Sequence, residues 1–128
     1  MNVRVFDASA VLAALFTEPG ADKVELLWAE GENWISAVNY AEVVTKLNER
    51  GMSDAEVEIV LEGVPLRVLD FEVQGALACG LMRTATKALG LSLGDRACLS
   101  TGRLLDAEII TGERLWKKLK GYNLHLIR

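Results

Sequence analysis

The sequence has little of what several common chemistries need. It contains one histidine and two cysteines in 128 residues, and aromatic residues make up 6% of the chain. Cys79 and Cys98 lack the CxxC spacing of zinc and redox sites, so we expect both to be small buried side chains in a reducing compartment. His125 lies in a predicted strand, where a structural role is expected. Glycine-rich phosphate loops and serine–histidine–aspartate arrangements are absent.

Long apolar runs are absent too. The uncharged stretches stop well short of the roughly 18 residues that a membrane span needs. The opening residues MNVRVFD lack the basic-then-apolar layout of a signal peptide. We therefore expect a cytoplasmic protein with no membrane partner. Apolar residues make up 51% of the chain, which is enough for the core of a single domain over 1–128.

Charge is unevenly divided along the chain, whose formal net charge is −4. Residues 1–64 contain four Lys/Arg against twelve Asp/Glu, whereas residues 65–128 contain ten against six. Because phosphate neutralisation supplies most of the affinity for a nucleic-acid backbone, a polyanion would have to meet a locally basic surface. The later half offers these candidates: Arg83, Lys87, Arg96, Arg103, Arg114, Lys117, Lys118 and Lys120. The alternative for Lys117–Lys120 is an ordinary solvated helix surface.

Short β-rich runs alternate with helical patterns. Strands are predicted at Val3–Asp7, Asn33–Ser36, Leu66–Leu69, Glu108–Thr111 and Leu124–Ile127. Helices are predicted at Ala8–Leu15, Ala21–Ala29, Ala37–Glu49, from a Ser53 cap to about Leu61, and at Phe71–Leu89, Gly94–Leu104 and Glu113–Leu119. This alternation predicts an α/β fold with a mostly parallel sheet and helices on both faces. Ligands of such sheets bind beyond the carboxyl ends of the strands, where the strand order reverses.

Four carboxylates are expected at that edge. Asp7 and Glu113 follow predicted strands, and Glu42 and Asp95 open or enter helices. Crowded carboxylates raise one another's pKa, and a hard divalent cation such as Mg²⁺ relieves their repulsion. Such a site can generate a hydroxide-like nucleophile and stabilise charge on a phosphate. The pattern therefore predicts a magnesium site.

Each carboxylate also has a structural alternative. Asp7 and Asp95 could cap helices, although Ser9 could equally cap the first one and leave Asp7 available. Glu113 suits the positive end of a helix dipole. Glu42 could be an exposed partner of Lys46.

The helix around Glu42 argues against exposure, because it is apolar on more than one side. One apolar stripe is formed by Tyr40, Val43, Val44 and Leu47. Glu42 points away from this stripe, among further small or apolar residues, so we expect it to be partly buried. A buried charge is costly unless it is paired or binds a metal. Asn39, one turn earlier, is placed to orient Glu42 or a water.

Four segments, taken in order, resemble PIN domains, and specifically the VapC-like toxins of toxin–antitoxin pairs. They are VFDASAVLAAL with the Glu18-Pro19 that follows, SAVNYAEV, LSLGDRACL and ITGERLW, and they span essentially the whole chain. The resemblance implies a Rossmann-like three-layer fold with strand order 3-2-1-4-5. It implies an endoribonuclease that uses Mg²⁺ or Mn²⁺, forms a homodimer and is held inactive by a cognate antitoxin.

The resemblance also assigns roles to residues. Asp7, Glu42 and Asp95 match the metal ligands, and Ser9 and Thr111 match residues that orient the site. Glu113 stands where the family more often has aspartate, and the extra methylene favours action through a water. From the charge asymmetry, the residues expected to track the RNA backbone are Arg96, Arg114, Lys117 and Lys118.

Two other interpretations are weaker. A phosphatase with an aspartate nucleophile usually has a second aspartate two residues later, where this chain has Ser9. A catalytically weak PIN-like module that binds RNA or protein stays open because of Glu113. Trp28, Trp34 and Trp116 are expected in the core, although one of them could line a groove for an antitoxin or a second copy.

Overall fold

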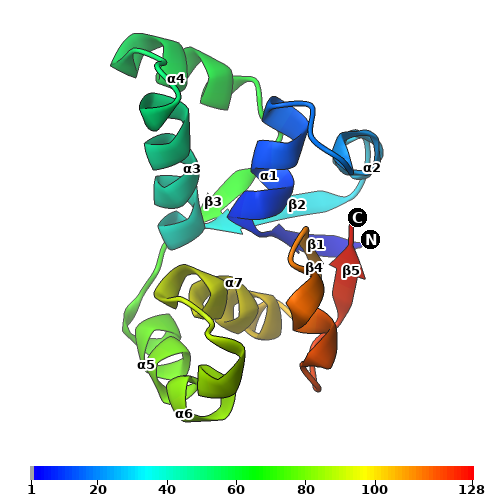
Figure 1. The fold of residues 1–128 in the computed structure, drawn as a ribbon, viewed down its shortest axis with the longest axis vertical. Helices are drawn as coiled ribbons and strands as arrows, with labels where there is room; N and C mark the ends of the chain where they lie inside the picture. Colours follow the sequence, from blue (N-terminus) through cyan, green and yellow to red (C-terminus); the bar gives the residue numbers. More distant parts are fainter. Residues whose placement is uncertain (1) are drawn as a thin grey trace.

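The computed structural model describes residues 2–128, which form a five-stranded parallel sheet (Figure 1). Its strands are β1 (Val3–Phe6), β2 (Glu32–Ser36), β3 (Arg67–Leu69), β4 (Glu108–Thr111) and β5 (Leu124–Leu126). Their order is β3-β2-β1-β4-β5, and every neighbouring pair is parallel. The predicted order, 3-2-1-4-5, is confirmed. Because the chain winds outward from β1 and then returns to β4, the reversal of strand order lies between these two strands.

Helices cover both faces of the sheet (Figure 1). One face carries α1 (Ala8–Leu15), α2 (Ala21–Trp28), α3 (Ala37–Glu49) and α4 (Asp54–Glu62). The other carries α5 (Val73–Leu81), α6 (Arg83–Thr86) and α7 (Leu93–Leu104), with the 3-10 segments η1 (Lys87–Leu89) and η2 (Arg114–Lys118). None of the helices formed by residues 2–128 is long and apolar enough to span a membrane.

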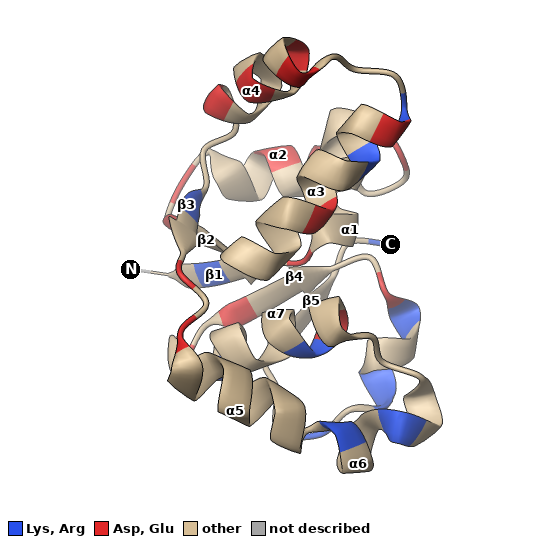
Figure 2. Cartoon of the chain, turned by 90° about the vertical axis from the view of Figure 1, so that its left-hand side faces the viewer, with Lys and Arg blue, Asp and Glu red and all other residues tan. Residues whose placement is uncertain are grey.

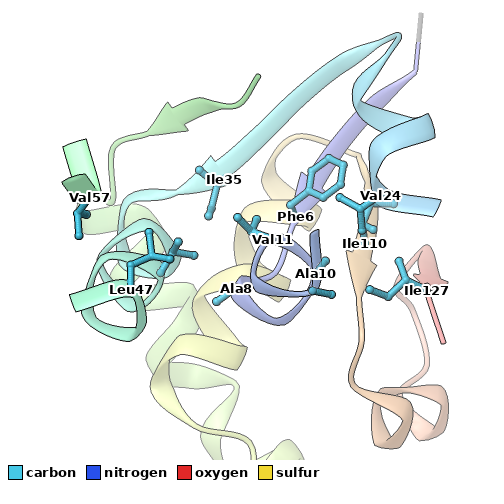
Figure 3. Packing of buried hydrophobic residues seen from close by; sticks show 12 residues of the cluster. Phe6, Ala8, Ala10, Val11, Val24, Ile35, Leu47, Val57, Ile110 and Ile127 are labelled. Atoms are coloured by element: carbon cyan, nitrogen blue, oxygen red, sulfur yellow. The ribbon is translucent and has the colours of Figure 1, made fainter. Parts of the chain in front are cut away.

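Alternation along the central strands divides the core into two clusters. Phe6 and Ile110 pack under α1 and α2, whereas Val5 and Ile109 pack under α7. Figure 3 shows the first cluster, with Val11 reaching toward Ile35 and with Val24 beside Phe6. Each such side chain contributes roughly 1.5–3 kcal/mol when it is fully buried. The two clusters clamp the central strands, so the carboxyl ends of β1 and β4 are rigidly placed.

Serine caps fix where three helices begin. Ser36 caps α3 by accepting a hydrogen bond from the Asn39 amide at 3.1 Å. Ser53 and Ser92 each form a capping box with the residue three positions later, which starts α4 and α7 respectively. Asp95 is therefore the third residue of α7, not its cap. Ser9 does not cap α1 either, because its hydroxyl is used elsewhere.

Two predicted helices differ in the structure. The long helix expected at Phe71–Leu89 is broken into α5, α6 and η1. Gly80 lowers the helix propensity just before the break, and the Thr86 hydroxyl beyond it bonds to the Met82 carbonyl at 2.8 Å. The helix expected at Glu113–Leu119 is a short 3-10 segment. The bounds of the remaining elements agree or differ by one residue.

Candidate metal centre

Asp7 is the single residue between β1 and α1, and it lies beside the end of β4. Its backbone amide still pairs with the Ile110 carbonyl at 2.9 Å. The side chain is 3% exposed and makes no helix-cap hydrogen bond. Its Oδ2 atom instead accepts hydrogen bonds from Ser9 Oγ at 2.6 Å and from Thr111 Oγ1 at 3.1 Å. The carboxylate is therefore anchored across the reversal point of the sheet.

The two hydroxyls are oriented by backbone amides. Ser9 Oγ accepts from the Gly112 amide at 2.9 Å, and Thr111 Oγ1 accepts from the Glu113 amide at 3.0 Å. Because each oxygen already accepts a backbone proton, its own proton is free to point at Asp7. The loop after β4 thus supports Asp7 through two relayed hydrogen bonds.

Glu42 reaches the same place from α3. Its Oε1 atom accepts a hydrogen bond from Asn39 Nδ2 at 2.8 Å, and that nitrogen also donates to the Gly94 carbonyl at 2.9 Å. Asn39 is fully buried, and Ser36 Oγ donates to its Oδ1 at 2.6 Å. Glu42 itself is half-buried, as its apolar helix predicts.

Asp95 comes from the first turn of α7. Its Oδ2 atom accepts from the Ser92 amide at 2.8 Å, and its own amide donates to Ser92 Oγ at 3.1 Å. The neighbouring Gly94 permits a close approach of two helices, since any side chain there would collide with the Glu42 carboxylate. A residue without Cβ is thus required for α7 to lie against Glu42.

The three carboxylates share a buried, negatively charged environment. The pKa of Asp7 is raised to about 6, mainly by burial and also by the charges of Asp95 and Glu42, while the hydrogen bonds from Ser9 and Thr111 oppose the shift. The thiol of Cys98 is buried beside the same groups, and burial together with all three carboxylates raises its pKa well above the usual range.

One oxygen of each carboxylate stays available. Hydrogen bonds hold Asp7 Oδ2, Glu42 Oε1 and Asp95 Oδ2, and no protein donor within residues 2–128 reaches the other oxygen of any of the three. Free carboxylate oxygens on one buried and two half-buried side chains are the donors that a hard divalent cation prefers. Within that same range, no three Asp, Glu, His or Cys side chains are already gathered tightly enough to form a ready-made ion site.

The other predicted site residues lie further out. Glu113 is exposed, and only its backbone amide joins the network around Asp7. Arg96 is half-buried and donates to the Cys79 carbonyl at 3.1 Å, so its guanidinium ties α7 to α5. Arg114, Lys117 and Lys118 are exposed on η2, with no carboxylate of residues 2–128 within 4.0 Å. Figure 2 shows the basic residues gathered at the end of the molecule that carries α6.

The residues expected to be structural are packed as such. Cys79, Cys98 and Trp116 are buried, and Trp28 and Trp34 are half-buried against the core. His125 lies on β5, where its Nδ1 is 3.4 Å from a Glu108 carboxylate oxygen.

Sequence reasoning missed Gly94 and Ser36 as parts of this centre. Gly94 carried a usable signal, because a glycine in the first turn of a helix weakens the helix unless something needs the space. Ser36 also carried a signal, because a serine just before a helix is a common cap, and its partner Asn39 lies only three residues later.

A parallel sheet of this order, with a buried aspartate at its reversal point, defines an open α/β fold whose candidate site lies at the carboxyl ends of β1 and β4. The chain matches the PIN domain family over residues 4–122 and belongs to it. A comparison with curated protein sequences gives no match.

Solved structures share the fold over nearly the full length. A toxin–antitoxin complex from Klebsiella pneumoniae superposes with a TM-score of 0.78 at 16% identity, covering 98% of this chain and 98% of that one. VapBC2 from Rickettsia felis, bound to promoter DNA, gives 0.76 at 18% identity, with 97% and 98% covered. VapC20 from Mycobacterium tuberculosis, a toxin that cleaves the sarcin–ricin loop, gives 0.74 at 16% identity, with 94% and 97% covered.

Proposed function

We propose that this protein is a Mg²⁺-dependent endoribonuclease and the toxin of a VapBC-type toxin–antitoxin pair, acting in the cytoplasm. The observation that carries the proposal is the buried Asp7 beside Glu42 and Asp95, each carboxylate held through one oxygen. Membership of the PIN domain family supports the nuclease class, and the folds shared with VapC toxins support the type.

Asp7 and Asp95 would hold the cation, and Glu42 would complete its coordination or accept a hydrogen bond from the attacking water. When bound, a divalent cation lowers the pKa of a coordinated water and neutralises charge developing on the phosphate. Ser9 and Thr111 fix the direction of the Asp7 carboxylate, and Asn39 fixes that of Glu42. A hydrolysis of this kind is an in-line displacement at an RNA phosphodiester. Mn²⁺, which also accepts oxygen ligands, is expected to substitute for Mg²⁺.

Glu113 is assigned a role through water, because its side chain is exposed at the edge of the centre. Arg114, Lys117 and Lys118 follow it on the exposed η2 segment, where they can neutralise backbone phosphates. Arg96 is the least suited of the four predicted RNA-binding residues, since its guanidinium is already hydrogen-bonded to the Cys79 carbonyl.

Two protein partners belong to the proposal. A cognate antitoxin is supported by the folds shared with toxin–antitoxin complexes. A homodimer is supported by α5, which has no charged residue and exposes Val73 and Leu77. Exposed apolar patches of this kind mark association sites. Light scattering of the antitoxin-free protein measures the subunit number.

The decisive test replaces Asp7 by asparagine. Asp7→Asn should lower Mg²⁺-dependent RNA cleavage by at least about a hundredfold, because the site loses a ligand charge. Asp22→Asn, an exposed position in α2, is the matched control and should cleave as wild type does. Cleavage is followed with end-labelled RNA and antitoxin-free protein, with and without a chelator. Equal cleavage by Asp7→Asn would refute the assigned site, and no cation-dependent cleavage by wild type would favour a module that only binds RNA or protein.

A further inference from the structure

A second concave region lies away from the carboxylates. It has a volume of about 530 Å³ and is lined by α5, α6, η1, the end of α7 and the segment from η2 to β5. Its apolar surface comes from Leu81, Met82, Leu89 and Leu119, and Arg103, Lys118 and Lys120 surround it. No Asp or Glu lines it. We call it the basic hollow.

The three cations of the basic hollow are not neutralised. No carboxylate within residues 2–128 comes within 4.0 Å of Arg103, Lys118 or Lys120. The cavity between α1 and α3 is different, because its lysine and arginines pair with Glu18 and Glu49. Cations with apolar surface between them and no acid nearby suit a ligand with an anionic backbone and a flat apolar part.

Arg103 is pre-positioned for an anion. Its guanidinium carbon lies 4.0 Å from the centroid of the Tyr122 ring. Burial raises the pKa of Tyr122, and Arg103 opposes that shift, so the phenol is neutral and does not cancel the charge. The planar group, stacked on one face, keeps its N–H edge for two parallel hydrogen bonds to phosphate.

Basic residues connect the hollow to the metal centre. The segments 83–90 and 114–122 together contain six Lys/Arg and no Asp/Glu. The second segment starts directly after Glu113, and Figure 2 shows that its basic residues continue toward those on α6. Along α7, Arg103 lies eight residues beyond Asp95, which is about 12 Å at the rise of an α-helix. This distance corresponds to a few nucleotides of backbone.

We propose that the basic hollow is a substrate subsite that holds one phosphate and an unstacked base of single-stranded RNA, a few nucleotides from the cut bond. This inference rests on the proposed ribonuclease function, which it extends by stating that the substrate is engaged as a splayed single strand. Single strands expose bases that apolar surface and guanidinium planes can cover. Arg103 takes this phosphate edge-on, and Lys118 and Lys120 each neutralise a neighbouring phosphate of the same strand.

The test measures binding separately from cleavage. In the Asp7→Asn background, a labelled single-stranded RNA of about 12 nucleotides is titrated by fluorescence anisotropy at several salt concentrations. The joint change Lys118→Ala and Lys120→Ala should weaken binding about tenfold and reduce the salt slope by about 1.4, since each lost phosphate contact on a single strand removes about 0.7. Both side chains are exposed, so the fold should be kept. Lys23→Ala, which removes one exposed charge on α2, is the matched control and should bind as the parent does.

Two further variants separate geometry from charge. Arg103→Lys keeps the charge but removes the planar guanidinium that can donate two parallel hydrogen bonds. RNA binding should therefore weaken about fivefold or more with an unchanged salt slope. Tyr122→Leu removes the support of Arg103 and should weaken binding although no charge changes. With the Asp7 side chain present, the double lysine change should raise KM and leave kcat within about twofold.

The outcomes distinguish the two proposals. If none of these changes alters the affinity for RNA, the proposed subsite is wrong, even if wild type cleaves RNA. Sensitive binding without any cleavage by wild type would overturn the ribonuclease function and keep the RNA subsite. If the lysine changes abolish binding of polyglutamate but leave RNA binding intact, the hollow takes an acidic protein partner and the inference is wrong.

Discussion

Asn39 Nδ2 lies 2.8 Å from Glu42 Oε1, and the same nitrogen is 2.9 Å from the Gly94 carbonyl oxygen. One amide group therefore joins α3 to the first turn of α7 and sets the direction of the Glu42 carboxylate. Asn39 cannot easily rotate, because Ser36 binds both its side-chain oxygen and its backbone amide.

Asn39→Ala should therefore weaken Mn²⁺ binding about 10–100-fold, the usual effect of losing a group that orients a metal ligand. Binding is measured by calorimetry on antitoxin-free protein. Asn48→Ala, at an exposed position of the same helix, should leave the affinity unchanged. An equal loss in both variants would mean that the effect comes from damage to α3.

The pKa of Asp7 makes stability depend on pH. Its folded-state value of about 6 lies above the ordinary 3.8, so the folded protein binds this proton more tightly than the unfolded chain does. The free energy of unfolding should therefore fall as pH rises between the two values, by up to about 3 kcal/mol from this group. Without metal, Asp7→Asn should be more stable than wild type at neutral pH and equal to it near pH 4.

Urea unfolding of the two proteins across this pH range isolates the effect, because all other titrating groups are shared. The difference should be present above the folded pKa and disappear below the unfolded one. A constant difference at every pH would contradict the burial of an ionised Asp7.

Divalent cations should stabilise the folded protein, because they neutralise the buried charge of the Asp7 carboxylate. Saturating Mg²⁺ or Mn²⁺ should raise the Tm of wild type by several degrees, since a ligand at a hundred times its Kd adds about 2.7 kcal/mol. Asp7→Asn should show little of this shift. Ca²⁺ tests geometry, because it prefers longer bonds and more ligands. Equal shifts in both proteins would place the cation elsewhere.

At Gly94, a change from glycine to alanine should have the opposite effect on stability from the one usual within a helix. Gly-to-Ala changes within helices normally stabilise by about 1 kcal/mol, and Gly80→Ala in α5 should do so because nothing lies near its added Cβ. Gly94→Ala should instead destabilise by about 1–3 kcal/mol and lower cleavage, because the new methyl displaces Glu42. Thermal unfolding and cleavage rates of the two variants are compared directly.

Glu113 should matter less than Asp7. Glu113→Gln is expected to reduce cleavage by about tenfold or less, since an exposed group acting through water contributes little electrostatic stabilisation. Rates are measured under single-turnover conditions beside Asp7→Asn. A loss as large as that of Asp7→Asn would mean that Glu113 binds the cation directly when substrate is present.

Much of the fold follows from local pattern. The bounds of α1, α3 and β4 are predicted correctly because each has a clear apolar period and clear end signals. The helix at 71–89 is mispredicted because its run of alanine, leucine and methionine has no proline, and the break depends on Gly80 and on the Thr86 bond to Met82. Propensity sums do not contain that hydrogen bond.

For the candidate centre, the sequence indicates which carboxylates to consider. It does not indicate which residues form hydrogen bonds with them. Glu42 is predicted to be partly buried from the period of its helix, and it is. From the sequence, Ser9 could be the cap of the first helix. In the structure its hydroxyl instead links the Asp7 carboxylate to the Gly112 amide. Contacts between residues about a hundred positions apart carry no signature in spacing. The same limit hides the exposure of the Glu113 side chain.

The twelve residues of α7 have one more consequence. The first turn of the helix carries Asp95 and its last turn carries Arg103, so one helix of fixed length connects the candidate metal centre to the basic hollow. If both proposals hold, that length would fix the number of nucleotides between the bound phosphate and the cut bond. The protein would then select a spacing in its RNA and would tolerate variation in the bases next to the broken bond.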